Sequence, residues 1–450
     1  MPVTLQAFLL PLVDALRDQG WTVDALTGRS NDAVMMGDAG VLQVHFDEVH
    51  QIGWYRSAMS LLRIGTLSRE ICELVALREY DVVHVHTPIA SFITRFALRS
   101  MPVEARPRII YTVHGFHFQD EPNPPLMSRL YHAGEQYSAH TTDDLVVMND
   151  RDEQAARELV KHTRATARPC TLHRIDGTGM DFGAYRSGPR ALCADEQEAV
   201  RTTLLAELGI PADALVVGLV AEMNENKRHR LLIEAARLLE AARLLAQPSI
   251  KHKTGHSRGS EPDRTRSIHY LLIGAGPLRD ALMQRVSEYG LQQQIHFTGQ
   301  LASDQVRQML PLCDVGILVS KREGLPRSLM EFIAAGVPVI GTTTRGIVDI
   351  VRDAEALCEP TPEALAELIA RYAADPVLRK TCATEQFDYA VSHFDTSVVI
   401  PRYLKLYRPI KAGIRVGAEQ PLRSLYRARA QTPAANHVQA GLLDSPAPSE

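Results

Sequence analysis

The sequence alternates short apolar, β-branched segments with helix-forming segments, and it does so in two successive series. In the first series, strands are expected at 41–46, 81–87, 108–114, 145–148 and 172–175. The second series restarts near residue 200, with strands expected at 215–221, 269–274, 294–298, 315–320 and 337–341. Most of these runs are continuously apolar, which is typical of parallel strands covered by helices on both faces. The pattern predicts two doubly wound α/β halves, with ligands bound beyond the carboxyl ends of the strands.

Composition shifts divide the chain further. We expect an N-terminal Rossmann-like domain over 1–190, a second one over 200–385, and helices over 386–408 that pack back toward the first domain. Residues 246–267 carry many charges and almost no apolar side chains, so they cannot offset the entropy of ordering and are expected to be flexible. The tail 409–450 lacks periodicity and is expected to be disordered.

Charge and cysteine content exclude several classes of protein. The 49 basic and 53 acidic residues give a net charge of -4, so no global field draws the chain to nucleic acid. The 6 cysteines form no C-x-x-C pair, which fits neither a zinc site nor a disulfide framework. The start lacks a signal-peptide pattern and no uncharged stretch is long enough to span a bilayer. We therefore expect a cytoplasmic protein.

Two glutamates follow the expected strand at 315–320 closely in the sequence. Glu323 follows the expected strand at 315–320, and Glu331 lies in the next helix, for which Pro326 suits the first turn and Gly336 the end. Apolar residues flank Glu331, so its carboxylate needs hydrogen-bond donors, and sugar hydroxyls would serve. Considered alone, the two residues could equally be a solvated helix residue and a loop charge.

The E-x7-E spacing within KREGLPRSLMEFIAAGVPVIGT resembles the donor-site signature of the retaining glycosyltransferases of family 4, which have the GT-B architecture. Similar segments follow the family order: DVVHVHTPIASFITRFALR at 81–99, IIYTVHGFHF at 109–118, GTGMDFGAYR at 177–186, VGLVAEMNENKRH at 217–229 and LLIGAGPLRDAL at 271–282. The resemblance is greatest to the branch that builds bacterial capsule, exopolysaccharide or O-antigen units. It implies two Rossmann-like domains that face a cleft.

The resemblance implies a role for each donor-site residue. Glu331 would accept hydrogen bonds from the ribose of a nucleotide sugar, and Glu323 would lie at the donor sugar's hydroxyls near the reacting carbon. The amides of Gly324 and Leu325, at a helix N-terminus, would face the pyrophosphate. Lys227 would add a cation for the same phosphates.

On the N-terminal side of the cleft, the family's T-x-H-G histidine corresponds to His114, with Thr112 and Gly115 beside it. The resemblance implies that His114 reaches the donor sugar. A structural histidine at a strand end is the alternative. For His84 and His86, which alternate on one expected strand, hydrogen-bonded core residues are the favoured interpretation, and their spacing alone is no metal site.

Three other positions concern the nucleotide. Many relatives carry an arginine five residues before the lysine, where this chain has Glu222, so the pair of cations is incomplete. Gly276 and Pro277 follow an expected strand but lack the third glycine of a dinucleotide fingerprint, and we expect a tight turn beside the nucleotide. The Gly-Thr-Gly at 177–179 is interpreted as a turn, with an interdomain loop near the phosphates as the alternative.

The implied reaction is transfer of a hexose or N-acetylhexosamine from a nucleotide sugar, with UDP as the expected nucleotide. Attack occurs on the face that the nucleotide leaves, and the leaving pyrophosphate acts as base. No cofactor or metal is expected, because Lys227 and helix dipoles serve the phosphates. An epimerase of the UDP-N-acetylglucosamine 2-epimerase type and a non-catalytic nucleotide-sugar-binding subunit are the alternatives.

The resemblance also implies a polyprenyl-diphosphate-linked acceptor and contact with the inner leaflet of the membrane. Trp54, Tyr55, Arg56, Arg63 and Arg69 form a basic and aromatic candidate for that contact, although a solvated helix is the ordinary interpretation.

The chain opens within a few residues of a helix stripe, whereas a Rossmann half begins with its central strand. We therefore expect the N-terminal sheet to be one strand short at its middle, or filled from elsewhere, and a version extended upstream to be more stable.

Overall fold

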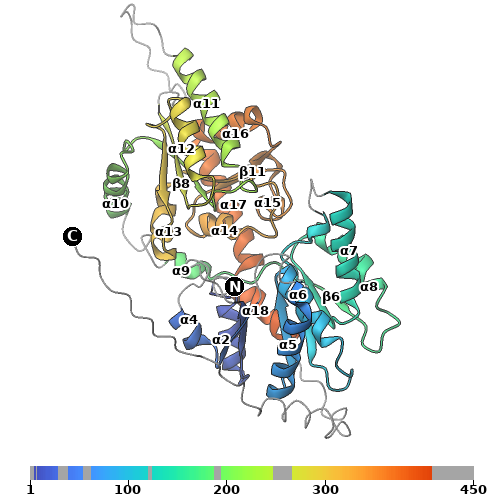
Figure 1. The fold of residues 1–450 in the computed structure, drawn as a ribbon. Coiled ribbons are helices and arrows are strands. Elements are labelled where there is room, and N and C mark those ends of the chain that lie inside the picture. Colours follow the sequence, from blue (N-terminus) through green and yellow to red (C-terminus); the bar gives the residue numbers. More distant parts are fainter. Residues whose placement is uncertain are drawn as a thin grey trace, which may run out of the picture.

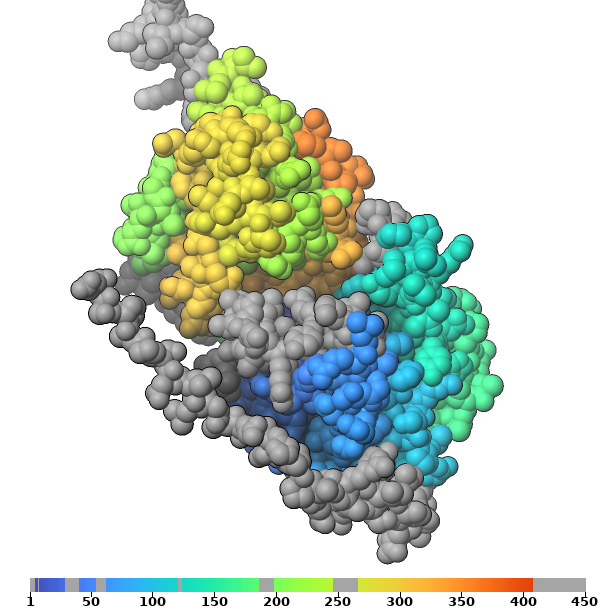
Figure 2. Space-filling model, in the orientation of Figure 1, coloured from blue at the N-terminus to red at the C-terminus, as the bar shows by residue number. Residues whose placement is uncertain are grey.

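The computed structural model describes residues 5–6, 8–28, 39–53, 62–119, 124–186, 194–246 and 266–407. It confirms the expected α/β class, with parallel strands arranged in two halves that lie one above the other in Figure 1. The space-filling view shows the same two halves in contact (Figure 2). Most of the expected flexible insertion, the whole expected disordered tail and the residues Trp54, Tyr55 and Arg56 lie outside the described residues.

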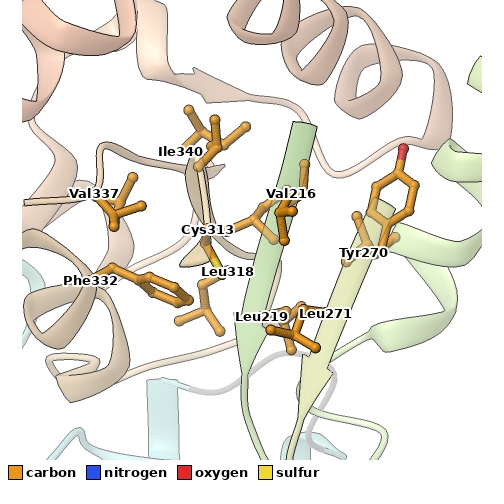
Figure 3. Close-up of a cluster of buried hydrophobic side chains, with 14 of the residues drawn as sticks. Val216, Leu219, Tyr270, Leu271, Cys313, Leu318, Phe332, Val337 and Ile340 are labelled. Atoms are coloured by element: carbon orange, nitrogen blue, oxygen red, sulfur yellow. The ribbon is translucent and has the colours of Figure 1, made fainter. Parts of the chain in front are cut away.

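The C-terminal half is a six-stranded parallel sheet in the order β12-β11-β10-β7-β8-β9. Its strands are β7 (Leu215–Val220), β8 (Ile268–Ile273), β9 (Ile295–Gly299), β10 (Val315–Leu318), β11 (Val339–Thr342) and β12 (Leu357–Cys358). Chain order reverses between β7 and β10, so the switch point of a doubly wound sheet lies there. The central strand β7 is paired on both edges, and Val216, Val217 and Leu219 have no exposed surface. Figure 3 shows these strands' side chains in the core.

Helices cover the sheets of both halves. Those of the C-terminal half are α10 (Ala194–Glu207), α11 (His229–Ala246), α12 (Arg279–Glu288), α13 (Ser303–Met309), α14 (Arg327–Ala334), α15 (Ile347–Val351) and α16 (Pro362–Ala374). Those of the N-terminal half are α2 (Leu10–Asp18), α4 (Ala39–His45), α5 (Ile64–Arg78), α6 (Pro88–Leu98), α7 (Pro125–Ala139) and α8 (Asp150–Lys161), with α9 (Phe182–Arg186) at the junction. None of the helices in the described ranges is both long and apolar enough to cross a bilayer.

The N-terminal half has two separate parallel sheets among its described residues. One contains β1 (Ala25–Gly28) and β2 (Val49–Ile52), and the other contains β3 (Val82–His86), β4 (Arg108–Thr112), β5 (Asp144–Val147) and β6 (Thr171–Arg174) in chain order. A cavity of about 820 Å³ has residues of both β1 and β3 in its lining. The prediction of a sheet that lacks its middle strand is therefore confirmed within this part of the chain.

The strand expected at 41–46 was wrong, because this segment forms the helix α4. The buried residues Leu42 and Phe46 are four positions apart and lie on one helix face, while Val44 between them is 73% exposed. The strands β1 and β2, which flank this helix in the chain, were not predicted.

Two final helices cross from the C-terminal half to the N-terminal half. After α17 (Pro376–Phe394), α18 (Thr396–Leu404) packs against α2, and Figure 1 shows it entering the lower half. The hydroxyl of Tyr403 donates a hydrogen bond of 3.1 Å to the carbonyl of Gly177. Gly177 and Gly179 both have positive φ, so this segment is a tight turn, and it packs between the halves.

The close packing around β7 gives a stability prediction. A Cβ at Gly218 would lie 2.4 Å from the sulfur of Cys313 and 2.9 Å from the Phe332 ring, so Gly218→Ala should lower the free energy of unfolding by about 1–3 kcal/mol. Gly65→Ala in α5 is the matched control, because an added methyl group there would meet no atom within 4 Å beyond its chain neighbours and the adjacent backbone of its own helix. Urea unfolding should show loss for the first variant alone. Equal effects would contradict the packing argument.

Candidate functional site

An ion pair occupies the switch point of the C-terminal sheet. Lys227 follows β7 and Glu323 follows β10, and their Nζ and Oε1 atoms are 2.6 Å apart. Backbone contacts hold the two loops together, because the Lys321 amide donates to the carbonyl of Asn226 and the Asn226 side chain donates to the carbonyl of Arg322. The sequence predicted that Lys227 and Glu323 share a site, and the structure brings them together at the carboxyl ends of adjacent strands.

The helix α14 carries the second predicted carboxylate. Glu331 lies inside the helix, and Gly336 follows its end with positive φ, both as expected, whereas Pro326 is the N-cap and not a residue of the first turn. Glu331 accepts a hydrogen bond of 3.0 Å from Arg327, while burial and the charge of Glu331 raise the pKa of Tyr185. A protein donor therefore already holds the carboxylate for which the sequence suggested sugar hydroxyls.

The loop before α14 touches the N-terminal half. A Cβ at Gly324 would lie 2.4 Å from the carbonyl oxygen of His114, so only glycine permits this approach. Gly115 has φ +110, and a Cβ there would lie 3.0 Å from the guanidinium of Arg345. Leu325 packs toward the turn at Gly177, where an added Cβ would be 2.9 Å from its side chain. These contacts bring Glu323 and His114 to opposite sides of one junction.

Three imidazoles form a chain behind this junction. Nε2 of His114 lies 3.2 Å from Nδ1 of His86. The ring centroid of His86 lies 4.2 Å from that of His84. His84 contacts the hydroxyls of Tyr407 and Thr112 at 2.5 and 2.8 Å, so Thr112 points into the protein and not toward a ligand. Burial lowers the pKa of His84 to about 3 and of His114 to about 4. The pKa of His86 is also lowered, by burial and by His84. All three rings are neutral at neutral pH.

The remaining predicted donor-site residues lie beside the segment after β7. Gly276 and Pro277 follow β8, and a Cβ at Gly276 would be 2.6 Å from backbone atoms of Met223. Glu222 is exposed and accepts a hydrogen bond of 3.0 Å from Asn224. No group of three or more histidine, cysteine, aspartate or glutamate residues converges as metal ligands within the described ranges.

Sequence reasoning missed a buried ion pair that joins the halves. Arg345 follows β11 and Asp152 lies in α8, and their side chains are 3.2 Å apart with 7% and 0% of their surfaces exposed. Asp152 also accepts hydrogen bonds from the Phe116 amide and from Asn149. Asn149 in turn lies 3.3 Å from the carbonyl of Gly324. Arg345 and Asn149 both follow strands at their carboxyl ends, which was the available signal.

The chain matches two family models and several relatives. Residues 5–171 match the model described as "Glycosyl transferase 4-like domain", and residues 200–387 match "Glycosyl transferases group 1". EpsD of Bacillus subtilis (strain 168), which is named as a glycosyltransferase, is 27% identical over 352 residues, covering 78% of each chain. The lipopolysaccharide core biosynthesis glycosyltransferase LpsE of Rhizobium meliloti is 27% identical over 204 residues, 45% of this chain and 52% of its own.

A solved structure shows the same fold. Anabaena Alr3699/HepE in complex with UDP superposes with a TM-score of 0.62 at 20% identity, covering 88% of this chain and 94% of that chain. At this identity the likeness establishes the architecture of two Rossmann-like domains, which is GT-B.

The neutral imidazoles predict a pH-dependent stability. Their folded pKa values lie below the ordinary value of 6.5, so unfolding takes up protons, and stability is lost as the pH falls from about 6.5 toward 4. His84→Gln should reduce the proton uptake near pH 5 by about one. Urea unfolding at several pH values in this range measures how steeply the free energy of unfolding changes with pH. Parallel profiles of the variant and the parent chain would contradict a neutral, buried His84.

The ion pair between the halves gives a second prediction. Arg345→Met should lower the free energy of unfolding by about 3 kcal/mol, because it leaves the Asp152 carboxylate buried without its cation. Adding Asp152→Asn to that variant should restore part of the loss, since the remaining side chain is neutral. Arg402→Ala, which removes an exposed partner 3.5 Å from Asp176, is the control and should have little effect. Additive losses in the double variant would exclude a direct coupling.

Proposed function

This chain is a glycosyltransferase with the GT-B fold, and we propose that it transfers a hexose or N-acetylhexosamine, with retention, from a UDP-sugar to a lipid-linked glycan in surface polysaccharide synthesis. The observation that carries the proposal is the Lys227–Glu323 pair at the switch point of the C-terminal sheet. In doubly wound sheets this is where nucleotides bind. Here a cation, a carboxylate and a helix N-terminus meet within two adjacent loops.

The pyrophosphate of the donor is assigned to the start of α14. Its first turn presents backbone N–H groups, and the helix dipole favours an anion there. Lys227 supplies the cation, although in the structure its ammonium is paired with Glu323. A donor diphosphate would compete for that ammonium, which would free a Glu323 oxygen for a sugar hydroxyl. Both groups would thus change partners when the donor binds.

The proposed chemistry breaks the bond between the anomeric carbon and the diphosphate oxygen, and forms the acceptor's bond on the same face. Negative charge grows on the diphosphate, where Lys227 and the α14 amides stabilise it, and the leaving oxygen takes the acceptor's proton. Positive charge grows on the ring carbon. A neutral His114 can hydrogen-bond the sugar without opposing that charge, and its lowered pKa keeps it neutral.

The nucleoside is assigned to the exposed side of α14 and the turn after β8. Glu331 is 18% exposed at its side chain, and Arg327 orients it. A carboxylate fixed in this way can accept hydrogen bonds from the two ribose hydroxyls. Gly276, Pro277 and Glu222 follow β8 and β7 at the same end of the sheet, and we assign them to the nucleotide as well.

The names of similar proteins support the nucleotide and the pathway class. HepE was crystallised with UDP, and LpsE is named for lipopolysaccharide core biosynthesis. The proposed acceptor is a polyprenyl-diphosphate-linked glycan presented at the inner leaflet. Two arginines of the segment considered for membrane contact lie among the described residues, and both have partners within the protein. Arg63 donates a hydrogen bond to the carbonyl of Gly53, and Arg69 lies 3.8 Å from Glu73.

The direct test compares lipid-linked glycans by mass spectrometry in cells with and without this protein. Loss should leave a glycan shorter by one hexose or N-acetylhexosamine. An unchanged glycan would contradict the acceptor class. Incubation with the donor alone separates transfer from epimerisation, because only an epimerase changes the donor sugar without an acceptor. A new sugar epimer would overturn the proposed transfer of that sugar.

Variants of the two carboxylates test the donor site. Glu331→Gln should weaken UDP-sugar affinity by about 1–3 kcal/mol, the scale of a charge-assisted hydrogen bond. Glu323→Gln should lower kcat more than affinity, because it faces the reacting sugar. Glu225→Gln, an exposed residue in the neighbouring loop, is the control. Calorimetry and initial rates measure both. Unchanged donor affinity in Glu331→Gln would remove that residue from the site.

A further inference from the structure

Arg106 is a buried arginine at the amino-terminal edge of the four-stranded sheet in the N-terminal half. It lies just before β4 and is 7% exposed, and its Nε atom is enclosed. Within the described part of the chain its guanidinium forms neither a hydrogen bond nor an ion pair. An arginine keeps its charge, and a buried charge is costly unless an anion balances it. The Arg106 charge is therefore available to an anion from outside the described chain.

The tip of the Arg106 side chain is open to solvent. Nε is the one guanidinium nitrogen that is both enclosed and unpartnered, so Nη1 and Nη2, which also have no partner among the described residues, reach the surface. The stem of the side chain is thus covered, while two donors at its end are accessible. Two parallel N–H groups of an arginine match two oxygens of a phosphate or carboxylate.

Arg168 holds the turn that carries Arg106. Its Nη1 atom donates to the carbonyls of Val103 and Arg106 at 3.3 and 3.0 Å. Its Nη2 atom donates to the carbonyl of Pro107 at 3.3 Å and to the carboxylate of Asp143 at 2.6 Å. The turn is therefore fixed by side-chain contacts before any ligand arrives, and the terminal nitrogens of Arg168 are used within the protein.

Positive charge exceeds negative charge around this turn. Burial lowers the pKa of Arg106, and the charges of Arg168 and Arg99 lower it further. Asp143 acts in the opposite direction, but its carboxylate is already paired with Arg168. Glu104, on the same turn, is exposed and forms no ion pair within the described residues. Three guanidinium groups thus share one buried carboxylate, which leaves an excess of two positive charges.

We propose that Arg106 is the centre of a binding site for a phosphate group, with Arg99 as its second cation. The two Nη atoms of Arg106 bind two phosphate oxygens. Arg99 is exposed, and its guanidinium lies 4.2 Å from the centre of the Tyr137 ring, at the surface beside the turn. A phosphate monoester carries a charge of about -1.5 to -2 at neutral pH, which matches the excess positive charge.

This site is separate from the proposed donor site and does not depend on it. Arg106, Asp143 and Arg168 precede β4, β5 and β6, so they lie at the amino ends of three parallel strands. His114 follows β4 at its carboxyl end, where it lies across the junction from Glu323. A strand of five residues is about 17 Å long. A phosphate at Arg106 would therefore not touch the donor.

The test compares the melting of the full chain and of Arg106→Met in sodium phosphate and in sodium chloride of equal ionic strength. In chloride the variant should melt at the parent's temperature or above, because it removes a buried charge without an ion pair. In about 20 mM phosphate the Tm of the parent should rise by about 2–5 °C for a dissociation constant near 1 mM. The variant should lose that gain.

Hydrogen exchange locates the bound phosphate. Exchange should slow about threefold or more over 99–109 in the parent chain, and this change should be absent in Arg106→Met. Phosphate that binds at the proposed donor site would instead protect the start of α14 in both chains. The two sites are thus distinguished in one measurement, without any assay of glycosyl transfer.

Two further variants serve as a second probe and a control. Arg99→Met changes an exposed side chain and should weaken phosphate binding about twofold to fivefold. Arg157→Met removes an arginine of α8 whose side chain is 65% exposed, and it should keep the full gain in Tm.

Vesicles of phosphatidylcholine with and without phosphatidylglycerol distinguish the source of the phosphate group. Flotation with the anionic vesicles that is lost in Arg106→Met would assign the site to a lipid headgroup. A gain in Tm without flotation would assign it to a soluble phosphate compound. Both results support the site.

Three results would overturn the proposal. An equal gain in Tm for Arg106→Met would show that phosphate acts elsewhere or through its general exclusion from the protein surface. No difference between phosphate and chloride in the parent chain would show that the site does not select phosphate. A large loss of stability of Arg106→Met in chloride would show that the protein itself already balances the charge of Arg106.

Discussion

The buried contact between Arg345 and Asp152 fixes the two halves of the molecule relative to each other. A carboxylate with no exposed surface must have its charge balanced, and the balancing guanidinium comes from the other half. Because Asn149 links the same carboxylate to the carbonyl of Gly324, the ion pair also sets the position of the loop that carries Glu323. The geometry of the junction between the halves therefore depends on a pair that would not itself touch the proposed donor.

Glycine makes that contact possible. Gly324 approaches the carbonyl of His114 more closely than a residue with a Cβ could, and at Gly115, which has φ +110, an added Cβ would lie 3.0 Å from the guanidinium of Arg345. A methyl group at position 324 would push the two backbones apart, and one at position 115 would press on the guanidinium that pairs with Asp152. The ion pair between Arg345 and Asp152 attracts the two halves, and the two glycines allow their backbones to come close.

The sequence was sufficient to predict elements whose residues are buried on both faces. Continuous runs such as 215–221 and 315–320 became β7 and β10, and the residues that follow them were correctly placed at one end of the sheet. The segment at 41–46 failed because β-branched composition concealed a spacing of four between Leu42 and Phe46. The strands β1 and β2 were not predicted, because four residues are too few to show a clear alternation of apolar and polar side chains. Arg345 escaped because its partner Asp152 is distant in sequence, and only the fold brings the two together.

The residues on the two sides of the junction are supported by sheets of unequal completeness. Lys227 and Glu323 follow β7 and β10, and both strands are hydrogen-bonded along both edges, so the sheet itself resists displacement of this pair. His114 follows β4, which is also paired on both edges, but the ring leans on His86, and the strand that carries His86 has one open edge among the described residues. Groups proposed to bind the diphosphate thus stand on a complete sheet, whereas the imidazole opposite them is supported through an incomplete one. A displacement of β3 would change the contact with His114, because Nδ1 of His86 lies 3.2 Å from Nε2 of His114.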